Sequence, residues 1–115
     1  MNQKKPIIIS LNGKKIKISD IKKCSEIGKI FGLMFKSKEK ANALLFEFSK
    51  PAKIAIHSLF VFFPFIALWL NDKNKVQEIK KITSFKLSIK PKNPFSKLIE
   101  IPLNSRYSSL IKGLS

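Results

Sequence analysis

The sequence contains few of the residues from which disulfides, metal sites and phosphate-binding loops are built. Cys24 is the one cysteine, so no bridge can form within the chain, and this usage is typical of a reducing compartment. His57 is the one histidine and lies far from Cys24 in the sequence, whereas a metal site needs several ligands at suitable spacing. The four glycines are scattered and form no phosphate-binding loop. We therefore expect a cytoplasmic protein with no metal site and no cofactor.

Acidic residues are also few, seven against 23 lysines and arginines, which gives a formal net charge of +16. Arg106 is the one arginine, so nearly all of this charge is carried by lysine. Lysine lacks the planar fork with which arginine reads bases and clamps phosphates. The charge is therefore either a solvated surface or a surface that binds polyanions at low salt without sequence preference. The candidate polyanion-binding residues are Lys14, Lys15, Lys17, Lys90, Lys92 and Lys97.

One long apolar run, residues 54–70, interrupts this charged sequence. A transmembrane helix needs about 20 apolar residues, with a lower limit of about 17. Pro64 near the middle of the run would remove a helical hydrogen bond, and the many β-branched and aromatic residues favour strands. We predict two buried strands joined at Pro64 and no membrane span, with a membrane anchor as the alternative.

The segment 6–18 has the pattern of a β-hairpin, because two apolar runs flank Asn12 and Gly13. Asn-Gly favours the type I′ turn, which needs a positive φ at both central residues. A short helix is predicted over 19–30, where apolar residues follow helical spacing.

The later segments alternate in the manner of strands separated by turns. Residues 85–90 alternate apolar and polar side chains, and Pro91–Pro94 reverses the chain. The tail, 105–115, has few apolar residues and is expected to be loosely ordered or a last edge strand. Strands are also predicted at 43–48 and 98–103, and turns at 49–51 and 71–74. Residues 76–82 are either a bulged strand or a helical turn.

Short strands, tight turns and one brief helix indicate a mainly β fold. We predict a single compact domain over 1–115, a β-sandwich or barrel of the jelly-roll kind with one short helix. Exposed strand edges leave a homodimer open.

Glu100 lies in the predicted strand between Ile99 and Ile101. Strand residues alternate between faces, so Glu100 faces water if the two isoleucines face the core. In the opposite register it is a buried carboxyl that needs a partner, and His57 then becomes of interest. The candidate pocket consists of His57, Ser58, Trp69 and Glu100.

Five motifs, in matching order and spacing, resemble those of the domain of unknown function 192 family. Gly32–Lys36 resembles the opening Gly-Leu-Met-Phe-Arg signature, and Leu44–Phe48 resembles a Met-Leu-Phe-x-Phe strand. Segments similar to Pro-Leu-Asp-Ile-x-Phe-Ile-Asp, Val-x-x-Ile and Val-Leu-Glu-Leu-Pro follow at Pro64–Asn71, Val76–Ile79 and Leu98–Pro102. The resemblance covers residues 24–103, and the segment before Pro64 is similar to the archaeal branch.

The resemblance implies a compact, mostly β fold of the jelly-roll or barrel kind and brings no established activity. Ile56–Val61 stands where the family has Phe-Trp-Met-Lys-Asn-Thr, and Ile66 stands where it has Asp. The Lys, Asn and Asp that could form a polar site in the family are therefore apolar here.

Two function classes precede all others. The first is a non-catalytic binding or interaction module that uses an apolar groove or an exposed edge strand. The second is a non-specific polyanion binder that acts through the lysines named above. An enzyme that uses His57 ranks third, because a lone base without a visible nucleophile or second carboxylate supports catalysis weakly, and we assign no catalytic residue.

Overall fold

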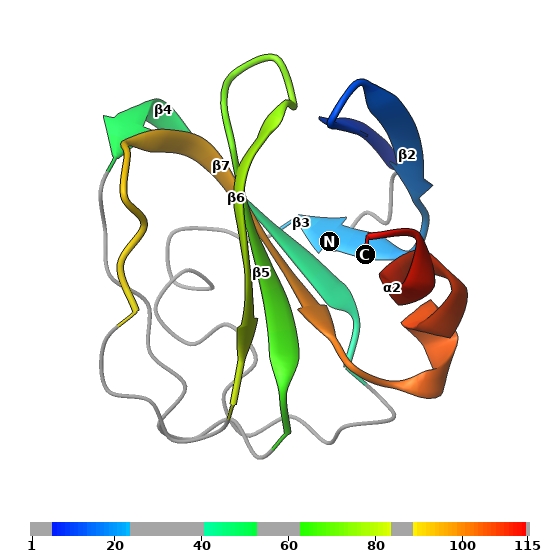
Figure 1. The fold of residues 1–115 in the computed structure, drawn as a ribbon. Helices are drawn as coiled ribbons and strands as arrows, with labels where there is room; N and C mark the ends of the chain where they lie inside the picture. Colours follow the sequence, from blue (N-terminus) through cyan, green and yellow to red (C-terminus); the bar gives the residue numbers. More distant parts are fainter. Residues whose placement is uncertain (1–5, 24–40, 53–62, 84–88, 115) are drawn as a thin grey trace.

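The computed structural model describes residues 6–23, 41–52, 63–83 and 89–114 (Figure 1). Within these ranges the chain is mainly β, as the sequence predicts. The elements are β1 (Ile7–Leu11), β2 (Lys14–Ile18), β3 (Ile21–Lys23), β4 (Ala43–Ala52), β5 (Phe65–Leu70), β6 (Val76–Ile82), β7 (Phe95–Pro102), the 3-10 helix η2 (Ser105–Tyr107) and the α-helix α2 (Ser108–Gly113).

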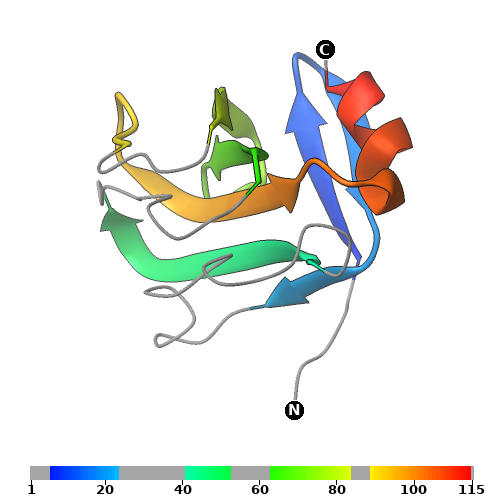
Figure 2. The same cartoon turned by 90° about the horizontal axis from the view of Figure 1, so that it is seen from below.

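Five strands form one sheet in the order β3-β4-β7-β5-β6, in which β3 is parallel to β4 and the other neighbours are antiparallel. The hairpin β1–β2 forms a separate two-stranded sheet. Its turn has a positive φ at both Asn12 (51°) and Gly13 (80°), which agrees with the predicted hairpin. Figures 1 and 2 show that the hairpin and α2 cover the same side of the five-stranded sheet.

Both faces of the five-stranded sheet are covered, and all six residues of β5 are therefore buried. The second half of the apolar run 54–70 is thus a buried strand, as predicted, while residues 53–62 lie outside the described ranges. The hairpin-side core, between the sheet and the hairpin with α2, includes Ile9, Ile18, Leu68 and Ile99. The aromatic-side core, on the opposite face, includes Phe46, Phe63, Phe65, Trp69 and Phe95.

The C-terminal segment is helical, so the expectation of a loose tail or an edge strand over 105–115 is wrong. Asn104 starts this segment by accepting a hydrogen bond from the Arg106 N–H and donating one to the Ala41 carbonyl, at 3.1 and 3.0 Å. The few apolar residues of the tail suffice because they pack on the hairpin-side core: Leu110, Ile111 and Leu114. Across the described ranges, no helix has the length and hydropathy needed to span a membrane.

The predicted helix over 19–30 is wrong at its start, since Ile21–Lys23 is a strand paired with β4. Ile21 is buried in the hairpin-side core, so tertiary pairing overrides the local helical spacing. Residues 24–40, which include Cys24 and the rest of this prediction, lie outside the described ranges.

Two strand predictions needed a different length or register. β4 continues to Ala52, with a register shift between Glu47 and Ala52 where the turn at 49–51 was expected. β6 is the bulged strand, with its register shift opposite Trp69 and Leu70, and not the helical turn. The predicted strand 85–90 falls mostly on residues 84–88, outside the described ranges.

Candidate polyanion-binding surface

The six lysines chosen from the sequence do not lie together. Lys14, Lys15 and Lys17 are on β2, whereas the segment that carries Lys90 and Lys92 lies on the other side of the five-stranded sheet (Figures 1 and 2). The structure therefore keeps the three hairpin lysines as a group and separates them from the later ones.

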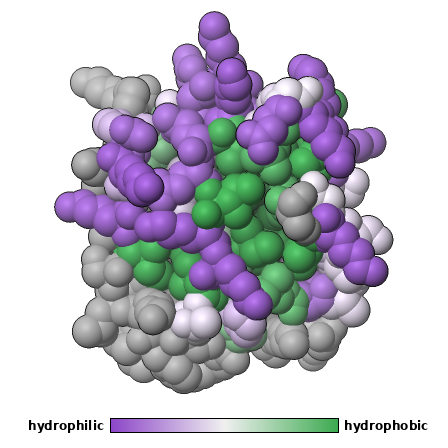
Figure 3. Space-filling model, in the orientation of Figure 1, coloured by the Kyte–Doolittle hydropathy of each residue, from purple (hydrophilic) through white to green (hydrophobic). Residues whose placement is uncertain are grey.

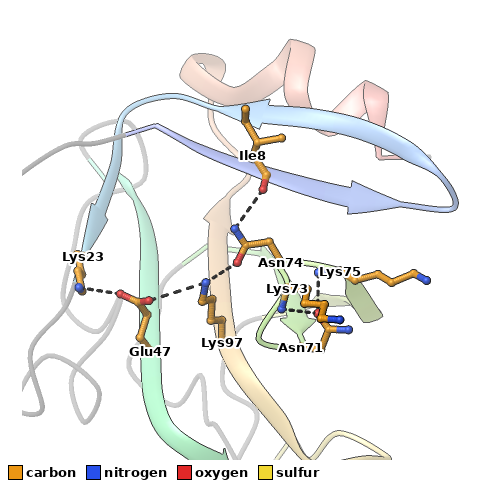
Figure 4. A network of polar contacts seen from close by, with 8 residues as sticks. All are labelled: Ile8, Lys23, Glu47, Asn71, Lys73, Asn74, Lys75 and Lys97. Carbon is orange, nitrogen blue, oxygen red and sulfur yellow. Dashed lines mark hydrogen bonds and ion pairs between the residues drawn. The ribbon is translucent and has the colours of Figure 1, made fainter.

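Lys97 is held inside the structure and is not free to bind an anion. Its ammonium donates a hydrogen bond to Asn74 Oδ1 and lies 3.9 Å from the Glu47 carboxylate, and only 18% of its side chain is exposed. Glu47 in turn pairs with Lys23 at 2.8 Å. Figure 4 shows this chain of contacts running across β3, β4 and β7 to the β5–β6 turn.

The β5–β6 turn brings two further lysines that the sequence reasoning missed. Asn71 Oδ1 accepts hydrogen bonds from the N–H groups of Lys73 (2.9 Å) and Lys75 (3.0 Å), which folds the turn around this side chain (Figure 4). Asn74 has a left-handed φ of 62°, a conformation that asparagine adopts more readily than most residues. Both lysines are exposed.

The turn is fastened to the hairpin by three contacts. The Ser10 N–H donates to the Asn74 carbonyl (2.9 Å), Asn74 Nδ2 donates to the Ile8 carbonyl (3.3 Å), and Ser10 pairs with Lys75 in a parallel bridge. These contacts make the turn a third backbone segment beside β1 and β2.

Three exposed lysines of β2 and the turn share one face: Lys15, Lys17 and Lys75. Lys15 pairs with Ser10 in the hairpin, and Ser10 pairs with Lys75, so the three side chains project to the same side. Two strand spacings separate the Cα atoms of Lys15 and Lys75 by about 10 Å. Lys17 lies two residues along β2 on the same face, opposite Ile8, which is 54% exposed.

We call this face the lysine surface, defined by Lys15, Lys17 and Lys75. Lys14 pairs with Leu11, which packs on the hairpin-side core, so Lys14 lies on the other face of the hairpin. In the part of the chain that the structure describes, Lys23, Lys80 and Lys97 form ion pairs, and none of the three members of the lysine surface has a carboxylate partner. Asp72 is the one carboxylate in the same turn. Figure 3 shows hydrophilic residues gathered over the β5–β6 turn and the hairpin. The charge excess is therefore local as well as global.

Ile99 and Ile101 face the hairpin-side core, but Glu100 on the opposite face is also buried, so the expectation that it faces water is wrong. It lies on the aromatic-side face of β7 between Leu44 and Ala67, and only 6% of it is exposed. Both faces of β7 are covered, so alternation with Ile99 and Ile101 does not bring Glu100 to solvent. Burial raises the pKa of this carboxyl to about 8, and none of the described cations pairs with it.

Of the predicted pocket, the structure places two residues on one face. Trp69 pairs with Leu98, two positions before Glu100, so the indole and the carboxyl are diagonal neighbours on adjacent strands. Among the described residues, the buried Trp69 Nε1 has no hydrogen-bond partner. His57 and Ser58 lie outside the described ranges.

Sequence patterns contain a partial signal for the lysine surface. The turn residues at 71–74 predict where Lys73 and Lys75 lie along the chain. The parallel bridge between Ser10 and Lys75 joins segments that are 65 positions apart, and no local pattern marks it.

The fold and the exposed lysine face define a small, open, mainly β protein with a basic end. A family model, described as Uncharacterized ACR, matches residues 9–111, and the chain belongs to this DUF192 family. No curated protein matches the sequence.

Two crystal structures share the fold. A protein of unknown function from Novosphingobium aromaticivorans is 13% identical, with a TM-score of 0.72, over 96% of this chain and 79% of that one. A protein from Sinorhizobium meliloti, described as "a putative transcription regulator", is 14% identical, with a TM-score of 0.74, over 94% of this chain and 84% of that one. At these identities the likeness shows the fold alone.

Proposed function

We propose that this protein is a non-catalytic binding module that holds anionic polymers on its lysine surface. The observation that supports this most is the shared face of Lys15, Lys17 and Lys75, three exposed lysines from β2 and the β5–β6 turn that have no ion-pair partner among the described residues. Lysine is a compact point charge, so this binding tracks phosphate or sulfate groups and has no sequence preference.

The proposal agrees with two other observations. The Sinorhizobium meliloti protein is described as "a putative transcription regulator", and its likeness to this chain extends only to the fold. The described carboxylates are mostly used elsewhere: Glu47 and Glu78 pair with lysines, and Glu100 is buried. Catalysis by His57 has no part in this proposal.

The test is fluorescence anisotropy with labelled random DNA, single-stranded and double-stranded, across a salt series. Each neutralised phosphate adds about 0.9 to the magnitude of the slope of log K against log salt on duplex DNA, so three lysines give a slope of up to about 3. The variant Lys15→Gln/Lys75→Gln should lower affinity and reduce that slope by about 2.

The matched control is Lys90→Gln/Lys92→Gln, which removes the same charge from the other side of the sheet. We expect this control to keep most of the affinity and the slope, because only long-range attraction is reduced. Equal losses in the two variants, or no measurable binding by the unmodified protein at low salt, would overturn the proposal.

A further inference from the structure

A groove of about 370 Å³ lies next to the lysine surface. One wall is formed by Asn71 and Asp72, at the start of the turn that carries Lys73 and Lys75. The size is within the range of small-ligand sites, about 300 to 1,000 Å³. The groove is therefore placed to receive a part of any polymer that lies on the lysine surface.

The lining of the groove is better suited to a neutral group than to a phosphate. Glu47 and Asp72 contribute two carboxylates, and the one ammonium of the lining, that of Lys97, is already bound to Glu47 and Asn74. Glu47 also pairs with Lys23, so its charge is balanced, and a neutral group with N–H donors would meet carboxylate acceptors. Gln77, which is exposed, adds an amide that can both donate and accept.

The remaining wall is apolar and partly aromatic. Phe48 lines the groove together with Pro94, and the Phe48 ring is held edge-on against Phe95 at 5.3 Å between ring centroids. A flat, neutral ring with amino or imino donors on its edge fits these walls. Nucleobases have this form, since they stack on aromatic side chains and donate hydrogen bonds from exocyclic amino groups.

We propose that the groove receives one unpaired base of a single-stranded nucleic acid whose phosphates lie on the lysine surface. This inference rests on the proposed function and narrows the polyanion to one class. A base in a duplex is stacked and paired, so it cannot enter the groove. In a single strand every base is flanked by phosphates, so a base site needs cations beside it, as found here.

The experiment compares three probes at one low salt concentration: a mixed-sequence single-stranded 12-mer, its duplex, and heparin. The single strand should bind at least about tenfold more tightly than the duplex, as one base stacked on a protein ring contributes a factor of about 5 to 150. Phe48→Leu, which keeps apolar volume and removes the ring, should weaken single-strand binding by about fivefold or more. Heparin binding and the salt slope should stay unchanged.

Phe48 also contacts the aromatic-side core, so two measurements separate binding from folding. Gln77→Ala changes an exposed groove residue and should weaken the single strand alone. A 12-mer that contains 2-aminopurine should gain fluorescence when this base leaves the stack of its neighbours and enters the groove, and Phe48→Leu should reduce that gain.

The outcomes are distinguishable. Equal binding of all three probes, unaffected by Phe48→Leu and Gln77→Ala, would overturn the base site and leave the proposed function standing. If heparin binding depends on Gln77 and single-strand binding is weak, the groove binds a saccharide, and this result would also overturn the base site. Absence of binding to every probe would overturn both proposals.

Discussion

The two faces of the five-stranded sheet each bury a polar side chain, but the partners available to that side chain differ between the faces. On the hairpin side, the Tyr107 hydroxyl accepts a hydrogen bond from the Ala43 N–H (2.7 Å) and donates one to the Asp20 carbonyl (2.9 Å). On the aromatic side, Glu100 has no cationic partner among the described residues, and its neighbours in the sheet are Leu44 and Ala67.

This difference shows that the Tyr107 hydroxyl has a structural role, whereas no described contact explains the burial of the Glu100 carboxyl. Buried polar groups in native proteins are almost always hydrogen-bonded, and Tyr107 follows this rule as it ties the C-terminal segment to β4 and to the chain before β3. Glu100 is kept neutral by burial, which raises its pKa to about 8, and the orphaned Trp69 Nε1 lies on the same face. We therefore expect Glu100, on the aromatic side, to make the free energy of unfolding depend on pH.

The largest expected effect comes from Glu100→Gln, which keeps the shape and removes the titration. A raised pKa in the folded state means that the stability contributed by the neutral acid is fully present below the unfolded value of about 4.5 and is lost as pH rises to about 8. Over that range the unmodified protein should lose about 5 kcal/mol relative to Glu100→Gln, and nothing further at higher pH. Urea unfolding from pH 4 to pH 9 measures this difference. Parallel pH profiles for the two proteins would contradict the burial of an unpaired carboxyl.

Tyr107→Phe tests the satisfied side of the comparison and has a smaller effect. The change leaves the Ala43 N–H without its acceptor and removes one of the two donors to the Asp20 carbonyl, which keeps Asn42 Nδ2 at 3.2 Å, at a cost of about 1 to 3 kcal/mol. Because neither group titrates, the loss should be constant over the same pH range. Ser108→Ala, which removes an exposed hydroxyl bonded to the Ser105 carbonyl, is the control and should change the free energy of unfolding by under about 0.5 kcal/mol. If the stability lost in Tyr107→Phe varied with pH, the contrast between a titrating face and a non-titrating face would be wrong.

The sequence predicts the parts of this fold that depend on local pattern. Asn12 and Gly13 mark the hairpin because their turn geometry is local, and the apolar residues of β5 mark a buried strand because burial on both faces leaves no alternation. The positions that fail depend on distant segments. Ile21 becomes a strand residue by pairing with Ala43, and Glu100 is buried because the second face of β7 is covered.

The candidate site shows the same limit. Its lysines are visible in the sequence as charge, but the six that were chosen from two predicted hairpins do not lie together. They separate onto two sides of the five-stranded sheet, and Lys97 is half-buried beside Glu47. Lys75 joins the surface through the contacts that Ser10 and Asn74 make between the hairpin and a turn of the other sheet. A turn motif gives the shape of that turn and carries no information on what it touches.

The smallest expected effect on stability comes from substitution of Asn74, whose side chain links Lys97 to the Ile8 carbonyl (Figure 4). Asn74→Gly keeps the positive φ and removes both contacts, so the turn and the hairpin should hold their lysines less firmly. Stability should fall by about 1 kcal/mol, and the affinity for labelled DNA should fall about two- to tenfold. Asn74→Ala should be less stable than Asn74→Gly, since a Cβ at a φ of 62° adds strain. If Asn74→Gly binds DNA like the unmodified protein while Lys15→Gln/Lys75→Gln does not, the lysines act without this link. The lysines of the surface then bind as separate charges, and the contacts of Asn74 that join the hairpin to the turn are not needed for DNA binding.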